Sequence, residues 1–316
     1  MLRAPFRIAR GVRESVDVVV VEIDQDGVTG RGEGTPTARY GETPEGVFDQ
    51  VGTAVDAVAR GADRQALRML MPPGAARNAI DCALWDLEAR LAGAPYAPPV
   101  TGLVSARTIS IDTPEAMGAA ARAVADARLI KVKLAGDDPA ARLRAVRANA
   151  PAATLVIDAN EGWSIDLLAA MQDVLVECDV KLVEQPLPAA EDSALAGFVS
   201  RIPICADESC HVAADVAGLR DRYGFVNIKL DKTGGLTEAL DLLATARGAG
   251  MGVMVGCMIG TSLAMAPALR VAAHADFADL DGPWWLREDR VGGLSFAEDG
   301  SIGAPSDDLW ACRQGA

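Results

Sequence analysis

Histidine and aromatic residues are scarce in this chain, which has two histidines and 4% aromatic residues among its 316 residues. Zinc sites usually take their ligands from histidine and cysteine, and neither His211 nor His274 ends an apolar run. A zinc centre is therefore not expected. Because aromatic rings are few, the apolar half of the sequence consists mainly of Ala, Val and Leu, which suit tight packing of helices on strands.

The chain also lacks an excess of basic residues. It has 30 Lys and Arg against 44 Asp and Glu, a formal net charge of −14 at pH 7. Nucleic acids and anionic membranes are bound through basic surfaces, so we expect neither as a partner. No stretch has the roughly 18 consecutive apolar residues of a membrane span. The N-terminus lacks the charged and then apolar order of a signal peptide, so export is not expected.

Paired cysteine motifs are absent as well. The six cysteines are scattered and include no CxxC pair, and several stand inside apolar runs, where a free thiol behaves as a small hydrophobic group. This pattern predicts a reduced, cytoplasmic protein without disulfides. The cysteines are Cys82, Cys178, Cys205, Cys210, Cys257 and Cys312.

Short apolar runs that each end in a charged residue recur along the second part of the chain. The steps between them are about 22 to 26 residues, the length of one strand, loop and helix. This rhythm predicts an α/β fold, a modified (β/α)7β TIM-like barrel with its functional groups at the C-terminal rim. We expect strands near 106–111, 129–133, 154–158, 181–184, 203–206, 225–229, 252–256 and 276–279.

The first 97 residues do not follow this rhythm. A β-branched run at 16–23, a turn at 24–27 and a returning strand at 28–34 indicate a hairpin. Helices are expected from Pro44 to about Arg60, after the N-cap Thr43, and from Ala75 to Leu91, ending at Gly93. We therefore predict three parts: an α+β capping domain at 1–97, a barrel at 98–283 entered through the proline-rich segment 95–99, and a tail at 284–316 that returns to the cap.

Three carboxylates end successive predicted strands. Asp158, Glu184 and Asp207 are hard oxygen ligands of the kind that Mg²⁺ prefers. A single Asp after a strand is more often a helix N-cap, but three in series favour a metal site. We expect one Mg²⁺ per subunit.

Lysines flank these carboxylates. Lys131 and Lys133 are two residues apart on one strand and therefore face the same way. Lys229 ends a strand further round the barrel and is expected to approach from the opposite side. Burial and nearby positive charge would lower a lysine pKa toward neutrality, as a general base requires. A substrate carbon between Lys133 and Lys229 could lose a proton to one and regain it from the other. Positive charge from Lys131 and Mg²⁺ would stabilise the enolate.

The motifs KxK at 131–133, DAN at 158–160, EQP at 184–186, ADES at 206–209 and NIKLDKTGG at 227–235 form a specific set. With them the chain resembles the enolase superfamily, muconate lactonizing subgroup, over nearly its whole length. Further segments narrow the resemblance to dipeptide epimerases acting on L-Ala-D/L-Glu: FRIARGVR at 6–13, GAARNAIDCALWDL at 74–87, ICADESCH at 204–211 and FADLDGP at 277–283.

The resemblance implies roles for individual residues. It implies metal binding by Asp158, Glu184 and Asp207, acid/base catalysis by Lys133 and Lys229, and polarisation of the substrate carboxylate by Lys131. Five more residues are implied to contact substrate. Asp279 and Asp281 would hold the dipeptide ammonium group, and Arg13 the glutamate carboxylate, while Thr108 and Cys257 would line the pocket. From the residues alone, Arg13 would normally be a surface residue, and Cys257 could equally be a buried small residue.

The predicted function is Mg-dependent epimerisation of L-Ala-L-Glu and L-Ala-D-Glu, in murein peptide metabolism. Other dipeptide epimerases, N-acylamino acid racemase, o-succinylbenzoate synthase and muconate cycloisomerase share the machinery and stay open as alternatives. The Asp279/Asp281 pair favours a cationic substrate group over an acyl group. A non-catalytic barrel is disfavoured by the complete set of lysines and ligands. A homo-oligomer is possible.

One feature departs from the resemblance. Family members usually have an opening strand before the segment that matches 6–13, and here five residues precede it. We expect a cap without this edge strand to be less stable.

Overall fold

The computed structural model describes residues 1–9, 11–93, 102–303, 305–306 and 308–310. The predicted proline-rich link at 95–99, and Cys312, lie outside these residues. Eight parallel strands form the central sheet in sequence order, and each pairs with the next along the chain. The strands are β5 (Arg107–Ile109), β6 (Leu129–Lys133), β7 (Thr154–Asp158), β8 (Val180–Glu184), β9 (Ile204–Ala206), β10 (Phe225–Ile228), β11 (Gly252–Val255) and β12 (Phe277–Ala278).

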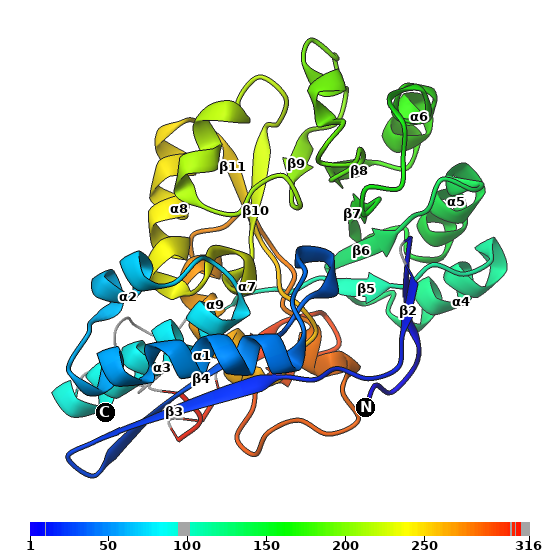
Figure 1. Cartoon of the computed structure of the whole chain (residues 1–316). Helices are drawn as coiled ribbons and strands as arrows, with labels where there is room; N and C mark the ends of the chain where they lie inside the picture. The colour runs from blue at the N-terminus through cyan, green and yellow to red at the C-terminus, as the bar shows by residue number, and fades with distance from the viewer. Residues whose placement is uncertain (10, 94–101, 304, 307, 311–316) are drawn as a thin grey trace.

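The sheet curls into a barrel, as predicted. A parallel bridge joins Ser105 to Ala278, and Ala106 N donates to Ala278 O at 2.8 Å, so the first and last strands meet. Figure 1 shows the curled sheet with helices along its outer side. These helices are α4 (Pro114–Ala123), α5 (Pro139–Asn149), α6 (Ile165–Glu177), α7 (Leu230–Thr233), α8 (Leu236–Gly248) and α9 (Ser262–Ala272).

Two of the crossovers differ from the ideal βα pattern. The segments after β8 and β9 contain only the 3-10 helices η2 (Asp192–Leu195) and η3 (Ala213–Gly218), and a third, η4 (Gly282–Trp285), follows β12. Pro186, Pro188 and Gly197 interrupt the segment after β8, and proline is incompatible with a helix interior. The barrel is therefore a modified (β/α)7β barrel, as predicted, with short 3-10 helices in place of α-helices after these two strands.

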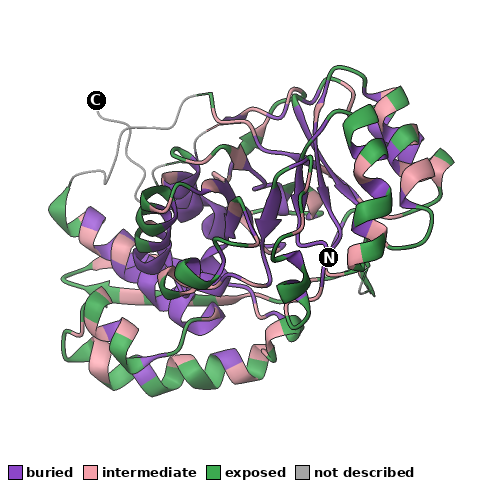
Figure 2. Ribbon diagram, turned by 90° about the horizontal axis from the view of Figure 1, so that it is seen from above, coloured by how far each residue is buried: buried purple, intermediate pink, exposed green. Residues whose placement is uncertain are grey.

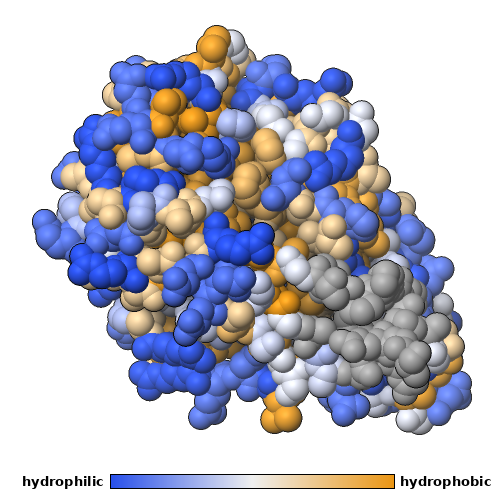
Figure 3. Space-filling view, turned by 180° about the vertical axis from the view of Figure 1, so that it is seen from behind, coloured by the Kyte–Doolittle hydropathy of each residue, from blue (hydrophilic) through white to orange (hydrophobic). Residues whose placement is uncertain are grey.

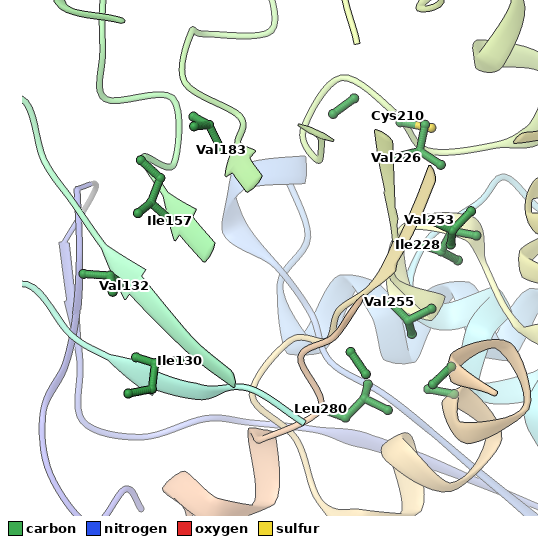
Figure 4. Packing of buried hydrophobic residues seen from close by; sticks show 14 of the residues in the cluster. Ile130, Val132, Ile157, Val183, Cys210, Val226, Ile228, Val253, Val255 and Leu280 are labelled. Atoms are coloured by element: carbon green, nitrogen blue, oxygen red, sulfur yellow. The ribbon is translucent and has the colours of Figure 1, made fainter. Parts of the chain in front are cut away.

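The strands alternate between two environments. Ile130 and Val132 on β6 point away from the barrel centre, and so do Val253 and Val255 on β11 (Figure 4). They join the large apolar cluster between strands and helices. Leu129, by contrast, belongs to a smaller cluster inside the barrel. Figure 2 shows the strands almost wholly buried, while the surrounding helices expose one side. Burial on both faces leaves only the strand ends free to carry chemistry.

The N-terminal elements gather at one end of the barrel (Figure 1). They are β1 (Phe6–Ile8), β2 (Gly11–Arg13), β3 (Val19–Gln25), β4 (Val28–Gly34), η1 (Ala38–Tyr40), α1 (Pro44–Ala59), α2 (Arg64–Leu70) and α3 (Ala75–Ala92). The predicted hairpin is β3–β4, the Thr43 side chain caps α1, and Gly93 ends α3 in the left-handed conformation. The hairpin β1–β2 and helix α2 were not predicted.

Glycines let α3 lie directly on β4. Gly30, Gly32 and Gly34 alternate along the strand, and a Cβ atom on Gly32 would stand 2.1 Å from the Ala79 carbonyl oxygen. A side chain at this position would therefore separate the two elements. The other face of α3 packs on α1 and α2 through Val47, Leu67 and Ile80.

The tail returns to the N-terminal elements, as predicted. Arg290 contacts Glu33 of β4 at 2.9 Å, and Trp310 donates through Nε1 to the Cys82 carbonyl of α3 at 3.1 Å. Between them, the hairpin β13 (Ser295–Phe296) and β14 (Ile302–Gly303) lies against the segment that opens the barrel, where Ser105 N donates to Gly300 O. The face opposite to that of Figure 1 is largely hydrophilic, with smaller apolar areas between (Figure 3). No helix within the described ranges could cross a bilayer.

Candidate active site

The register of the sheet places the charged strand ends side by side. Lys133 lies opposite Asp158 in the β6–β7 pairing, and Asp158 lies opposite Glu184 in the β7–β8 pairing. Asp207 directly follows β9, and Lys229 directly follows β10. Parallel strands bring their carboxyl ends to one rim, so side chains far apart in sequence meet there.

Lys131 is more enclosed than Lys133 and Lys229, with 1% of its surface exposed against 7% for each of them. Its Nζ lies 2.6 Å from Glu184 Oε2, 2.7 Å from Asp279 Oδ2 and 3.1 Å from Asp158 Oδ2. The lysine therefore joins the predicted metal ligands to the predicted ammonium-binding pair.

Two more lysines contact the carboxylates from different directions. Lys133 donates to Asp158 Oδ2 at 2.6 Å, and Lys229 donates to Asp207 Oδ2 at 2.7 Å. Lys232 contacts Asp207 Oδ1 at 2.7 Å and donates to the Asn227 and Cys210 carbonyls. The structure thus brings together all three predicted ligands and all three predicted lysines, while Lys232 is held by the backbone as a structural residue.

The ion pairs decide the pKa values of these groups. Burial opposes the charge on Lys131, but Asp279, Glu184 and Asp158 outweigh it and raise its pKa. Asp207, followed by Glu184, raises the pKa of Lys229 against the same burial effect. The predicted lowering of the lysine pKa is therefore wrong for these two residues, because each ammonium group lies against carboxylates.

The carboxylates respond in two ways. Lys133 and Lys131 hold the pKa of Asp158 below its usual range despite burial, and Lys229 and Lys232 do the same for Asp207. Burial, reinforced by Asp158, raises the pKa of Glu184. Among the three predicted ligands, Glu184 is therefore the one whose negative charge is least compensated by the protein.

The donor set fits a hard divalent cation. The buried oxygens Glu184 Oε2 and Asp207 Oδ1 accept no hydrogen bond, although each faces a lysine ammonium group. Within the described part of the chain, no three His, Cys, Asp or Glu side chains lie close enough together to hold a metal ion as placed. Lysine ammonium groups stand between the carboxylates. Asp158, Glu184 and Asp207 would hold the ion.

Asp279 and Asp281 follow β12 and are both at least 94% buried. Thr108 of β5 contacts both: its backbone N donates to Asp281 Oδ2 at 2.9 Å, and its Oγ1 donates to Asp279 Oδ1 at 3.4 Å. Burial, followed by the neighbouring Asp279, raises the pKa of Asp281. Asp279 and Asp281 are two enclosed carboxylates, and Lys131 is the lysine that contacts this pair. A further positive charge bound beside them would therefore be favourable.

A cavity of about 430 Å³ joins these groups. The lysines and Asp207 line it together with Asp279 and Asp281, while the hairpin β1–β2 and η1 contribute its upper wall. Arg13 on β2, Thr108 and Cys257 also line it, as predicted from the resemblance. Burial, followed by Asp279 and Asp281, raises the pKa of the Cys257 thiol. Asp158 and Glu184 are not among the residues that line the cavity. They contact Lys133 and Lys131, which do line it.

Several residues of the site were missed by sequence reasoning. Asn227 Nδ2 donates to Glu184 Oε1 at 2.7 Å, and Gln185 Oε1 accepts from the backbone N of Asp207 at 2.8 Å. Both hold a ligand in place. The spacing of Asn227 and Lys229 puts them on the same face of β10, and this period could have identified Asn227. Arg39 and Tyr40 carry no such signal, because they precede α1 in a loop.

Comparisons with known proteins agree with this geometry. Residues 1–98 match the N-terminal domain of the mandelate racemase and muconate lactonizing enzymes, and residues 116–307 match the family described as enolase C-terminal domain-like. The chain belongs to this family, the enolase superfamily. It is an enzyme, an isomerase of the racemase and epimerase class.

Similar proteins of this class act on dipeptides or on an N-acyl amino acid. The chain is 46% identical over 303 residues to an L-Ala-D/L-Glu epimerase of Escherichia coli, which covers 93% of the chain and 94% of that relative. It is 43% identical over 299 residues to an N-acetyl-D-glutamate racemase of Pseudoalteromonas, again covering 93% and 94%.

A crystal structure of an enolase family member from Agrobacterium tumefaciens with homology to dipeptide epimerases has a TM-score of 0.95 and 49% identity. The match covers 98% of this chain and 96% of that one, which is described with bound sodium and L-Ala-L-Glu. A dipeptide epimerase from Enterococcus faecalis, complexed with Mg and L-Leu-L-Tyr, has a TM-score of 0.88 and 29% identity, covering 96% and 93%.

Proposed function

We propose that this protein epimerises L-Ala-L-Glu and L-Ala-D-Glu by a two-base 1,1-proton transfer. The observation that carries the proposal is the placement of Lys133 and Lys229. They extend from separate strands into one cavity, and each is held by a different carboxylate. A substrate α-carbon between them exposes its proton to one lysine in the L-form and to the other in the D-form.

The substrate is oriented by charges at both ends of the cavity. The α-ammonium group of the first residue would bind Asp279 and Asp281, and the side-chain carboxylate of the second residue would meet Arg13. The α-carboxylate of the glutamate would lie next to Lys131, whose ammonium group stabilises the additional negative charge that forms when the α-proton leaves. Lys133 and Lys229 then exchange roles as base and acid in the two directions.

We infer that the metal ion is Mg²⁺, held by Asp158, Glu184 and Asp207. When bound, it supplies positive charge for the developing dianion. The gathering of three buried carboxylates around lysine ammonium groups and the raised pKa of Glu184 support a cation at this place. We propose that the reaction serves the metabolism of murein peptides; the relatives named as epimerases of L-Ala-D/L-Glu support the dipeptide as substrate.

Proton NMR of L-Ala-L-Glu in D₂O, with enzyme and Mg²⁺, tests the proposal. We expect loss of the glutamate α-proton signal together with appearance of the L,D diastereomer, and loss of both changes after chelation with EDTA. Washout of the α-proton without the second diastereomer would contradict the two-base arrangement. Full activity in EDTA would contradict the metal assignment alone.

A second candidate is racemisation of N-acyl glutamate, which the similarity to an N-acetyl-D-glutamate racemase favours. An N-acyl group carries no charge and would give Asp279 and Asp281 no cation beyond the Lys131 ammonium group at Asp279. We therefore expect N-acetyl-glutamate to react at least tenfold more slowly than L-Ala-L-Glu in the same assay. The opposite order would replace the dipeptide proposal with this one.

A further inference from the structure

The capping loop (residues 35–42) forms part of the cavity wall. Thr37, Ala38, Arg39 and Tyr40 all line the cavity that contains the lysines. The base of this loop is fixed within the fold. Thr35 N donates to the buried Asp231 at 2.9 Å, and Glu42 accepts from Thr37 N and Ala75 N at 2.9 and 2.8 Å.

The tip of the loop contacts the barrel through an ion pair. Arg39 Nε and Nη2 donate to Glu161 Oε2 and Oε1, both at 2.7 Å, across 122 residues of sequence. The Glu161 side chain is 8% exposed and that of Arg39 is 39% exposed. A bidentate pair of this kind is directional and stronger than a single contact between exposed charges.

Glu161 lies in the loop that follows β7, and it is held by hydrogen bonds to the loop that follows β8. It follows β7 by three residues, its backbone N donates to the Gln185 carbonyl at 2.9 Å, and its Oε1 accepts from Ala189 N at 2.9 Å. Both Asn160 and Glu161 have a left-handed backbone, with φ of 46° and 67°. Such a conformation in two successive non-glycine residues needs support from its surroundings. Glu161 is thus the more enclosed and more extensively hydrogen-bonded partner of the pair.

The loop tip carries Tyr40 to the catalytic side of the cavity. The Tyr40 ring packs edge-on against His211, with 4.8 Å between ring centroids, and Tyr40 lines the same cavity as Lys229. Displacement of the tip would therefore remove one wall next to a proposed base and admit water to the site.

We propose that the Arg39–Glu161 ion pair is a latch that holds the capping loop closed over the cavity before substrate arrives. These are positioning residues, since neither contacts the reacting atoms in the proposed mechanism. The kinetic part of the inference rests on the proposed function, whereas the structural part, closure of the loop, does not.

The latch has a defined kinetic signature. If only the closed form binds substrate well, apparent affinity falls in proportion to the closed fraction. Breaking the latch should therefore raise KM by roughly three- to tenfold, the range expected from losing one partly buried charge-assisted pair. Because the loop is closed in the substrate-bound form of both the wild type and the variants, kcat should change by less than about threefold.

Three variants separate the latch from other contacts of Glu161. Glu161→Gln removes the charge but keeps an amide oxygen that can accept from Ala189 N. Arg39→Met removes the partner and leaves Glu161 intact. Glu177→Gln is the matched control, because the Arg144–Glu177 pair joins α5 to α6 with the same bidentate geometry at distances of 2.7 to 3.1 Å, far from the cavity.

Hydrogen exchange measured by mass spectrometry on a peptide covering 36–43, with KM and kcat on L-Ala-L-Glu, decides the question. We expect faster exchange and a higher KM in Glu161→Gln and Arg39→Met, no further change in the double variant, and neither effect in Glu177→Gln. Unchanged exchange at 36–43 in both single variants would overturn the latch. If the wild-type enzyme does not turn over this dipeptide, the proposed function fails, and the exchange data still decide the latch.

Discussion

Lys133 and Asp158 face each other across the β6–β7 pairing, with 2.6 Å between the ammonium nitrogen and Oδ2. The pairing fixes a proposed base next to a proposed metal ligand through backbone register alone. The corresponding contact on the other side, between Lys229 and Asp207, comes from adjacent strand ends instead. The two lysines are therefore positioned independently, and each can be tested without moving the other.

Replacing either lysine should separate proton exchange from epimerisation. In Lys133→Met and in Lys229→Met we expect epimerisation to fall by roughly 10²- to 10⁴-fold, the usual contribution of a general base. Each variant should still wash out the α-proton of one diastereomer, and the two variants should act on opposite diastereomers. Lys181→Met is the control, because Lys181 lies exposed on β8 and pairs only with a surface carboxylate, Asp179. Loss of the α-proton from the same diastereomer in both variants would contradict the proposal that the two lysines act on opposite faces of the substrate carbon. NMR in D₂O measures all of these.

Arg13 should control preference for an acidic second residue. In Arg13→Met we expect kcat/KM for L-Ala-L-Glu to fall by about 10- to 100-fold, as for a lost charged hydrogen bond, with a much smaller loss for a dipeptide with an apolar second residue. Steady-state kinetics on the two substrates measure the ratio. Equal losses on both would show that Arg13 supports the fold of β2 and does not read the side chain.

The glycines of β4 should be essential for packing of the cap. Gly32→Ala places a methyl group against the backbone of Ala79, so we expect a loss of about 1–3 kcal/mol or more in unfolding free energy. Gly52→Ala is the matched control, because a Cβ atom there meets nothing within 4 Å in the exposed part of α1. That change should stabilise the protein by about 0.5–1 kcal/mol. Urea unfolding measures both, and equal effects would contradict the packing described here.

Asp81 should make stability depend on pH. Burial raises its pKa to about 6, although hydrogen bonds from Thr237 oppose the rise. The native state therefore retains a proton that the unfolded state releases near pH 4, and the favourable contribution is lost as pH rises through about 6. From pH 4 to 7 the wild type should lose about 3 kcal/mol relative to Asp81→Asn. Denaturant unfolding at several pH values tests this. Asp56→Asn, on the exposed side of α1, should run parallel to the wild type.

The barrel was predictable from sequence because its strands are buried on both faces. Continuous apolar runs that end in charges locate β6 and β7 to the residue. Capping signals placed α1 and α3, since Thr43 and Gly93 act through local backbone geometry. The short helices after β8 and β9 were not predicted, because their conformation depends on packing beneath the rim.

The site was predictable only in part. The lysines and carboxylates stand at regular positions along the chain, so their meeting follows from the topology. The pKa of Lys229 did not follow, because it depends on the distance to Asp207, which no spacing reveals. Arg39 and Glu161 were missed for the same reason: their pairing joins two loops that sequence patterns do not relate.

The return of the tail to β4 and α3 has a consequence for how the protein is made. Glu33 and Cys82 emerge from the ribosome long before their partners Arg290 and Trp310, which follow them by 257 and 228 residues. The first and last strands of the barrel likewise meet only when Ala278 is available to pair with Ser105. Contacts of such sequence separation form slowly. The nascent chain therefore cannot complete either unit until these later segments have emerged from the ribosome.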